Sequence, residues 1–375
     1  MKKNYISALA VLACVAVFCT ISGNSFHQMR TATEEIIPGE GVTEVRMLSD
    51  YFPDLAGTAG DTQIYVLQGE QEGGSCLILG GTHANELGGH MGAVLFVENA
   101  KVEAGTLYVI PRTNNSAFTH NDPQEGHPST VHITTDEGNV REFIHGSRAT
   151  NPVDQWPDPD VYVNYMGQSL SGSENRNINR TYPGKADGTL TEMMSYGIVQ
   201  LINTENIDVT VDLHEASPEY PVINALIAHE RAMNLASNVV VDMQMEGVQI
   251  SLEPSPTDLR GLTHRELGDH TDTLALLMEA PNPAQGRLRD RTDEALVLTG
   301  KSETYVKAGE IGQLYVPYDE NGWPIEVRCA RHVFGIERIL ANYSEMYEEP
   351  IIVTGMPSYD ELVKNGMGPY LNEPT

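Results

Sequence analysis

The chain has 375 residues, enough for one large α/β domain or for a domain with an appendage. Hydrophobic residues make up 40% of it and charged residues 20%, which are ordinary globular values and exclude extensive disorder and collagen-like repeats. The formal net charge of −29 at pH 7 gives a surface that repels nucleic acids and anionic lipids, so we expect no nucleic-acid partner.

The first 25 residues are typical of an export signal. Lys2 and Lys3 precede an uncharged, apolar run over residues 6–23, and this order of charge and apolar core marks a signal peptide. The run is also just long enough to cross a bilayer, so an uncleaved anchor is the alternative. We expect an exported protein, periplasmic or extracellular, that meets a membrane only through this segment if the segment is retained.

From residue 40 to residue 375 the sequence predicts one domain in which strand-like and helix-like segments alternate. Short apolar or β-branched runs predict strands, and amphipathic spacing predicts helices. The predicted strands are 63–67, 76–79, 106–110, 209–213 and 273–278, and the predicted helices are 86–97, 190–202, 232–245 and 330–347. Such alternation is typical of an α/β domain with a largely parallel or mixed central sheet.

Residues 113–176 interrupt this pattern. They are rich in Asn, Asp, Pro, Gly, Ser and His and show little periodicity, so they are either disordered or an ordered excursion of the domain. Trp156, Tyr162 and Tyr165 favour order, because aromatic side chains usually need something to pack on. We expect a loop-rich insertion beside the active site.

The first candidate ligands follow the predicted strand 76–79, in the sequence GGTHANE. His83 and Glu86 are three residues apart across a turn that opens a helix, so an imidazole and a carboxylate can converge on one cation. The pattern H-x-x-E alone is a common surface pair. Its place at a strand end strengthens the metal interpretation, since α/β domains bind ligands beyond the carboxyl ends of their strands.

A second predicted strand, 209–213, runs into the sequence DLHE and ends beside His214. A histidine there is usually a core or capping residue. Together with His83 and Glu86, however, it completes the two-histidine, one-carboxylate set of a catalytic zinc. Asp212 and Glu215 are both candidates to orient the imidazole, and the sequence does not choose between them.

The last predicted strand, 273–278, is followed directly by Glu279. An acid after an apolar run is costly to bury, and burial beside zinc would tune it as a general base for water; a solvent-facing acid is the plain alternative. Asn179 and Arg180, in the sequence NINRTYPG, stand side by side and can grip a carboxylate, because arginine offers a planar fork and asparagine an amide.

The motifs GGTHANE, NINRTYPG, DLHE and LLMEAP occur in this order between about residues 63 and 346. Together they resemble the zinc carboxypeptidase clan, most closely its succinylglutamate desuccinylase/aspartoacylase branch, which has similar GxHGNE and DLNRxFPG motifs. The resemblance implies a central mixed β-sheet flanked by helices. It also implies one zinc per chain, held by His83, Glu86 and His214. By the same resemblance, Glu279 is the general base and acid, and the Asn179–Arg180 pair binds a substrate carboxylate.

Two positions depart from the branch, since Ala84 stands where it usually has Gly and Asn177 where it usually has Asp. The family also uses an arginine to polarise the scissile carbonyl. Arg112, Arg148 and Arg176 compete for this role, and we take Arg176 as the first choice because it is nearest to the Asn-Arg pair.

These observations predict an exported zinc hydrolase, a deacylase that cleaves the amide bond of an N-acyl amino acid or a peptide-like substrate with a free carboxylate. The partner is then a small molecule or a short peptide. A zinc carboxypeptidase acting on peptides is the alternative within the same chemistry. A non-catalytic zinc-containing binding protein is the alternative from a different class.

Overall fold

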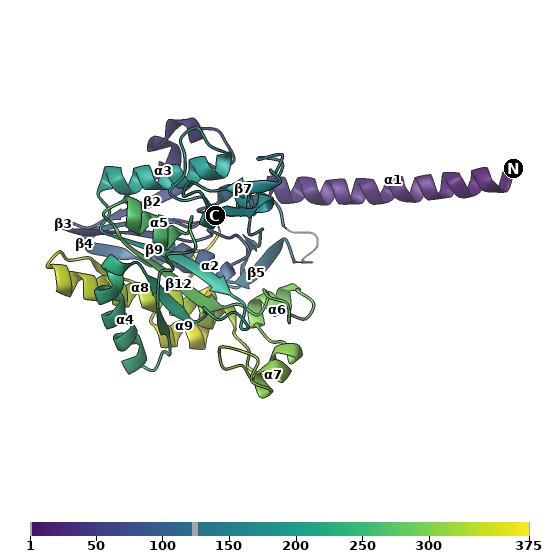
Figure 1. Cartoon of the computed structure of the whole chain (residues 1–375). Helices are drawn as coiled ribbons and strands as arrows, with labels where there is room; N and C mark the ends of the chain where they lie inside the picture. The colour runs from purple at the N-terminus through teal and green to yellow at the C-terminus, as the bar shows by residue number, and fades with distance from the viewer. Residues whose placement is uncertain (1, 122–126, 375) are drawn as a thin grey trace.

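A mixed β-sheet with helices on both faces forms the centre of the molecule (Figure 1). This computed structural model describes residues 2–121 and 127–374. The strands of the main sheet are β1 (Glu44–Met47), β2 (Gln63–Gln68), β3 (Gln71–Leu79), β4 (Lys101–Ile110), β9 (Val209–Ala216), β10 (Ala225–Ala228), β11 (Ser251–Pro254), β12 (Leu274–Pro281) and β13 (Ile352–Thr354). The helices are α1 (Lys2–Thr31), α2 (Leu87–Asn99), α3 (Leu190–Glu205), α4 (Met233–Met245), α5 (Thr263–His270), α6 (Glu294–Thr299), α7 (Glu303–Glu310), α8 (Ile325–Tyr347) and α9 (Tyr359–Asn365).

Eight strands of the sheet follow the order β1-β2-β4-β3-β9-β12-β10-β11, and β13 pairs with β4. The four central strands β4, β3, β9 and β12 are parallel to one another, whereas β2 and β10 run antiparallel to the central strands beside them. The predicted fold class, an α/β domain with a mixed central sheet flanked by helices, is confirmed.

Alternate residues of the central strands enter two separate cores. Cys76 and Ile78 of β3 pack in the core that α2, α4 and α8 cover, while Leu77 and Leu79 pack in the core beneath α3. Because side chains of a strand alternate between its faces, a strand that is buried on both faces is expected to be largely apolar. The segments 76–79 and 274–278 are accordingly apolar on both faces, whereas β9 also carries the buried polar residues Thr210 and Asp212.

All nine predicted elements are present, and most are longer than predicted. The helix predicted over 190–202 is α3, which begins at a capping box between Thr189 and Glu192 and ends at Asn206, whose φ of 52° is left-handed. The short strands β1, β10, β11 and β13 were not predicted. They have three or four residues each, too few to show an alternation in the sequence.

The region 113–176 contains two small hairpins rather than loops alone. β5 (Thr130–Thr134) pairs with β6 (Val140–Ile144), and β7 (Val161–Val163) pairs with β8 (Ser169–Ser171). Phe143 of β6 is buried in the main core, so the first hairpin is part of the domain. Residues 122–126 of the predicted insertion lie outside the described residues.

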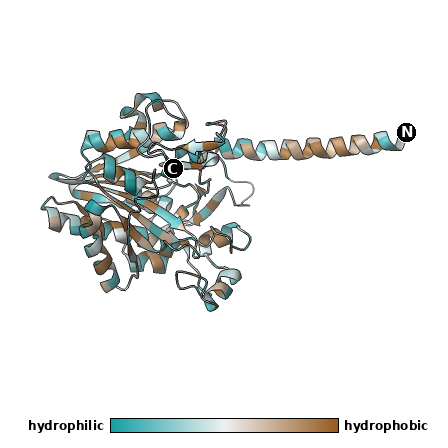
Figure 2. Cartoon of the chain, viewed as in Figure 1, coloured by the Kyte–Doolittle hydropathy of each residue, from teal (hydrophilic) through white to brown (hydrophobic). Residues whose placement is uncertain are grey.

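The N-terminal segment is a single helix that projects from the rest of the molecule (Figure 1). Its residues Asn4–Thr31 have a mean hydropathy of 2.3 in their most apolar window, and none of that window is buried, so the helix is long and apolar enough to cross a membrane. Figure 2 shows this hydrophobic character along most of α1. The helix is consistent with either a signal sequence or an anchor, and it extends beyond the predicted segment to Thr31.

A short strap after α1, residues 34–37, is bound tightly to the domain. The buried Glu34 carboxylate lies 2.6 Å from Nε2 of His90 on α2 and accepts the backbone N–H of Ile144 at 2.7 Å. At the other end of the strap, the backbone N–H of Ile37 donates to Glu98 at 3.2 Å. Both ends of α2 are therefore linked to the residues that follow the N-terminal helix.

Candidate metal centre

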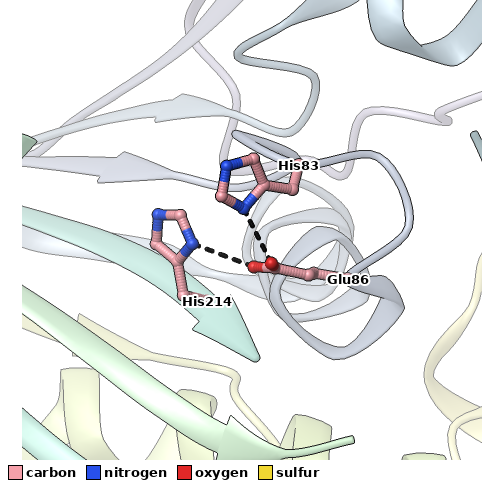
Figure 3. Close-up of side chains that lie close together, drawn as sticks. All are labelled: His83, Glu86 and His214. Atoms are coloured by element: carbon pink, nitrogen blue, oxygen red, sulfur yellow. Dashed lines mark hydrogen bonds and ion pairs between the residues drawn. The ribbon is translucent and has the colours of Figure 1, made fainter. Parts of the chain in front are cut away.

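His83, Glu86 and His214 meet at the carboxyl ends of the parallel strands β3 and β9. One ligand atom from each of the three lies within 4.8 Å of the others, and all three side chains are buried. Figure 3 shows the Glu86 carboxylate between the two imidazoles, with one oxygen directed at each ring. This is the edge of a parallel sheet at which α/β domains bind ligands, so the three candidate ligands come together at the expected edge.

Glycines allow the turn after β3 to bring Glu86 close to β9. Gly81 has a φ of +60°, a left-handed conformation that glycine adopts without strain, and it turns the chain towards His83. At the start of α2, a Cβ on Gly88 would clash with the Glu215 carboxylate, and a Cβ on Gly89 would clash with the Leu213 carbonyl. The first turn of α2 therefore lies directly against β9.

The tautomer of His83 is fixed by its neighbour Asn177. Oδ1 of Asn177 accepts the backbone N–H of Asn179 at 3.1 Å and lies 3.0 Å from Nε2 of His83, so Nε2 is the nitrogen that carries hydrogen. Burial and the nearby Arg148 lower the pKa of His83 to about 4, which keeps the ring neutral. Nδ1 of His83 is consequently an acceptor, and it faces Oε1 of Glu86 at 2.7 Å.

This arrangement fits a bound cation. Two acceptor atoms 2.7 Å apart repel unless a positive charge lies between or beside them, and Arg148 reaches them only from one side, at 3.2 and 3.3 Å. Two imidazole nitrogens and one carboxylate are a donor set that proteins use for catalytic zinc. His83, Glu86 and His214 would therefore hold the metal, with the carboxylate shared between the two rings.

His214 is oriented by Asp212, which decides between the two candidates of the sequence. Nε2 of His214 lies 2.8 Å from Oδ2 of Asp212, whose other oxygen accepts the Thr82 hydroxyl at 2.6 Å. Nδ1 of His214 lies 2.9 Å from Glu86. Burial alone would lower the pKa of His214, but the carboxylates of Asp212 and Glu86 outweigh it and raise the pKa. A metal bound at Nδ1 would therefore take the place of the proton that His214 shares with Glu86.

Glu215 has a different role, since its side chain points to the opposite side of the sheet from His214. Its two carboxylate oxygens lie 2.9 and 3.1 Å from Nη1 of the fully buried Arg328, and one of them also accepts the backbone N–H of Gly88 at 3.1 Å. Its own backbone N–H donates to Glu86 at 3.0 Å. This buried ion pair ties α8, α2 and β9 together directly behind the ligand Glu86.

Glu279 lies on β12 directly opposite His214 in the parallel register, so both side chains point to the same face of the sheet. Both residues line a cavity of about 390 Å³ that also contains His83 and Glu86. Oε2 of Glu279 is buried and has no hydrogen-bond partner among the described residues. Burial and the neighbouring Glu86 raise the pKa of Glu279 to about 8, although His214 opposes the shift.

Asn179 and Arg180 line the same cavity from the short 3₁₀ turn η5 (Ile178–Arg180), which follows a similar turn, η4 (Gly172–Arg176). Oδ1 of Asn179 accepts the backbone N–H of Thr263 at 2.8 Å, which holds the pair in place. Within the described residues, Arg180 forms an ion pair only with Glu174, at 3.9 Å, and burial lowers its pKa. A mostly buried guanidinium with so little local counter-charge is suited to bind an anion from the cavity.

Of the three arginines considered for the carbonyl, Arg148 lies in the cavity and Arg176 does not line it in the described structure. Arg176 forms a bidentate ion pair with Asp158, at 2.7 and 3.0 Å. Arg112 stacks over Phe118, with 4.5 Å between the guanidinium carbon and the ring centroid. The position of Arg148, next to Glu86 in the cavity, therefore favours it for the carbonyl-polarising role over Arg176, the first choice from the sequence.

Comparison with solved structures gives neighbours of the kinds that the motifs resemble, at low sequence identity. A metallo-carboxypeptidase from Burkholderia cenocepacia is 12% identical over 82% of this chain and 66% of its own, with a TM-score of 0.46. A succinylglutamate desuccinylase/aspartoacylase from Rhodobacter sphaeroides is 14% identical over 80% and 61%, with a TM-score of 0.41. A succinylglutamate desuccinylase from a Silicibacter species is 17% identical over 60% and 55%, with a TM-score of 0.39.

The chain thus matches less than two thirds of the length of each of these three structures. No family model matches the sequence, and none of the curated proteins is significantly similar to it.

Several residues of the cavity were not predicted from the sequence. One wall is apolar, and a polar group on another wall includes Glu253 and His264, whose Nδ1 lies 2.7 Å from the Ser255 hydroxyl. The apolar wall consists of Val222, Ile227, Leu259, Leu262 and Leu277. Ile227 comes from β10, Leu277 from β12, Val222 from the loop before β10, and Leu259 and Leu262 from the loop before α5, so no single stretch of sequence contains them. The cluster of His264, Arg265 and Glu266 was the only local signal.

Proposed function

We propose that the protein is an exported zinc-dependent amide hydrolase that acts on an N-acyl amino acid or a short peptide with a free carboxylate. One observation carries this proposal. A buried His-Glu-His set, an unpartnered carboxyl oxygen of Glu279 and two arginines, Arg148 and Arg180, converge on one cavity of about 390 Å³ in the described part of the chain. This combination supports hydrolysis, because it offers a metal site, a proton carrier and two anion-binding groups together.

Each side chain has a distinct task in this reaction. A zinc ion in the site supplies Lewis acidity towards water and the scissile carbonyl. Glu279 accepts the proton of the attacking water and donates it to the departing amine, a role that fits a carboxyl whose pKa is raised towards neutral pH. Arg148 stabilises the negative charge that develops on the carbonyl oxygen, and Arg180 holds the substrate carboxylate.

The apolar wall favours a carboxypeptidase as the second candidate function. A cavity of this volume has room for more than a single small acid, and Leu259, Leu262 and Leu277 would contact a non-polar side chain next to the carboxylate at Arg180. A peptide with an apolar last residue fits both features. The two candidates share their chemistry and differ in the group on the far side of the scissile bond.

A substrate panel tests the proposal. The purified protein should contain about one zinc and should release product from at least one acyl-amino acid or peptide, detected by mass spectrometry. Converting the free carboxylate of an active substrate into an amide should lower kcat/KM by about 30- to several-thousand-fold, because an unpaired buried Arg180 costs roughly 2–5 kcal/mol. In Arg180→Ala the acid and the amide should react at similar rates.

Three results would count against parts of this function. Stoichiometric zinc in both His83→Ala and His214→Ala would show that the metal is bound elsewhere. Zinc at the site without hydrolysis of any panel member would favour a non-catalytic binding protein. Equal discrimination between acid and amide by wild type and Arg180→Ala would move the carboxylate site to another arginine.

A further inference from the structure

The two imidazoles of the metal centre have partners of unequal charge. Nε2 of His214 faces the carboxylate of Asp212 at 2.8 Å, whereas Nε2 of His83 faces the neutral amide of Asn177 at 3.0 Å. An anionic partner makes a metal-binding imidazole more basic and holds it in place, and such partners usually change metal affinity about 10- to 100-fold. Among the described residues, none places an anion in direct contact with Nε2 of His83.

A carboxylate does lie one step further away. Nδ2 of Asn177 donates to Oε2 of Glu174 at 2.8 Å, while its Oδ1 accepts from His83 and from the backbone of Asn179. The amide cannot be turned over, because its nitrogen would then face an N–H and its oxygen a carboxylate. Hydrogen bonds in a chain polarise one another, so the charge of Glu174 makes Asn177 a stronger acceptor for His83.

We propose that Asn177 and Glu174 form a relay that positions His83 and sets the metal affinity of the site, with Asn177 as the contact and Glu174 as the source of charge. In this relay the negative charge of Glu174 lies 3.9 Å from Nε of Arg180 and is not in direct contact with the candidate metal ligand His83. It rests on the proposed function only in taking zinc as the metal. Asn177 and Glu174 are both positioning residues, since neither needs to touch the substrate.

The test exchanges the two groups without changing the net charge. The double variant Asn177→Asp/Glu174→Gln brings the carboxylate into direct contact with His83, and the introduced glutamine amide can donate to that carboxylate. We expect this variant to bind zinc at least as tightly as wild type, and Asn177→Ala to bind it about 10- to 100-fold more weakly. The measurement is the zinc dissociation constant from competition with a chelator of known affinity.

A matched control separates positioning from general stability. Asn175 is also buried, two residues away, and its side chain accepts from Gln155 at 2.7 Å rather than from a ligand. Asn175→Ala should lower the melting temperature of the zinc-free protein. It should leave the zinc dissociation constant within about threefold of wild type, because Asn175 does not contact a metal-binding side chain and only the partners of such side chains are expected to change zinc affinity. If Asn177→Ala does not fold, as judged by circular dichroism, Glu174→Ala tests the relay at a partly exposed position. It should weaken zinc binding, by less than the about 10- to 100-fold expected for loss of the direct partner Asn177, and unchanged zinc binding would overturn the relay.

The outcomes separate this inference from the proposed function. Zinc binding by wild type that is unchanged in Asn177→Ala, or a double variant that binds zinc more weakly than wild type, would overturn the relay and leave the hydrolase proposal intact. Absence of zinc binding by wild type would overturn both. None of these measurements depends on finding the substrate.

Discussion

Glu279 illustrates how one residue combines burial with access to the cavity at the candidate metal centre. Its carboxyl follows four consecutive buried residues of β12, and burial raises its pKa to about 8. A carboxyl with a pKa near neutral can both accept and return a proton, which an ordinary glutamate does less well at pH 7. Its position opposite His214 follows from the register of β9 and β12.

Glu279→Gln should keep the zinc and lose at least about a hundredfold in kcat, because general acid–base catalysis typically contributes about 10²–10⁴-fold. Glutamine has nearly the same shape, so binding of substrate should change little. The measurements are zinc content by elemental analysis and steady-state kinetics on an active substrate. Near-normal kcat with intact zinc would assign proton transfer to another group.

Substitution of Arg148 and substitution of Arg176 should have different effects, although Arg148 is close to the candidate ligands in space and Arg176 is close to the Asn179–Arg180 pair in sequence. Arg148→Ala should lower kcat about 10²- to 10³-fold, the usual effect of losing a donor to a developing negative charge. Arg176→Ala removes an ion pair with Asp158 and should mainly lower the melting temperature. Steady-state kinetics and thermal unfolding of both variants compare the two roles, and a larger loss of kcat in Arg176→Ala would reverse the assignment.

At the scale of elements, the strap 34–37 is the least expected support of the site. It is not a helix or a strand, yet Glu34 binds His90 in the first half of α2, the helix that begins directly after Glu86. Burial alone raises the pKa of Glu34, but the charges of His90 and Arg112 outweigh it and hold the pKa below its ordinary value. The ionised form is therefore stabilised by folding.

Glu34→Gln should lower the free energy of unfolding by about 1.5–3 kcal/mol at pH 7, as expected for a buried hydrogen bond to a charged group. Since the folded pKa is lowered, this stabilisation is present above the unfolded pKa of about 4.3 and is lost as the pH falls through the folded pKa. Urea unfolding measured from about pH 7 down to about pH 3 should show that the free energies of unfolding of wild type and Glu34→Gln become equal at the acid end.

Glu40→Gln is the matched control for this comparison. The carboxylate of Glu40 is exposed and pairs with Lys101 at 2.9 Å on the surface, so its loss should leave stability nearly unchanged at every pH. A difference between Glu34→Gln and wild type that stays constant across the whole pH range would show that the charge of Glu34 does not contribute.

At the scale of the whole molecule, the central sheet and the candidate metal ligands could be predicted because both depend on short, local patterns. His83, Glu86, His214 and Glu279 all stand at or just beyond the point where an apolar strand run stops. The walls of the cavity could not be predicted in the same way, because residues such as Leu259 and Leu277 meet only after the sheet has formed. Arg148 needed the path of the region 113–176, which has no periodicity to interpret.

The strap also sets a limit on how the N-terminus can be processed. α1 ends at Thr31, its residue Arg30 already pairs with Asp154 at 2.6 Å, and Glu34 is bound within the domain, so the apolar helix passes into residues that contact the domain with no free linker between them. A peptidase that releases the domain must cut before this point. A cut beyond Ile37 would instead leave His90 buried without its carboxylate and would remove a support of α2, the helix that follows the turn carrying His83 and Glu86.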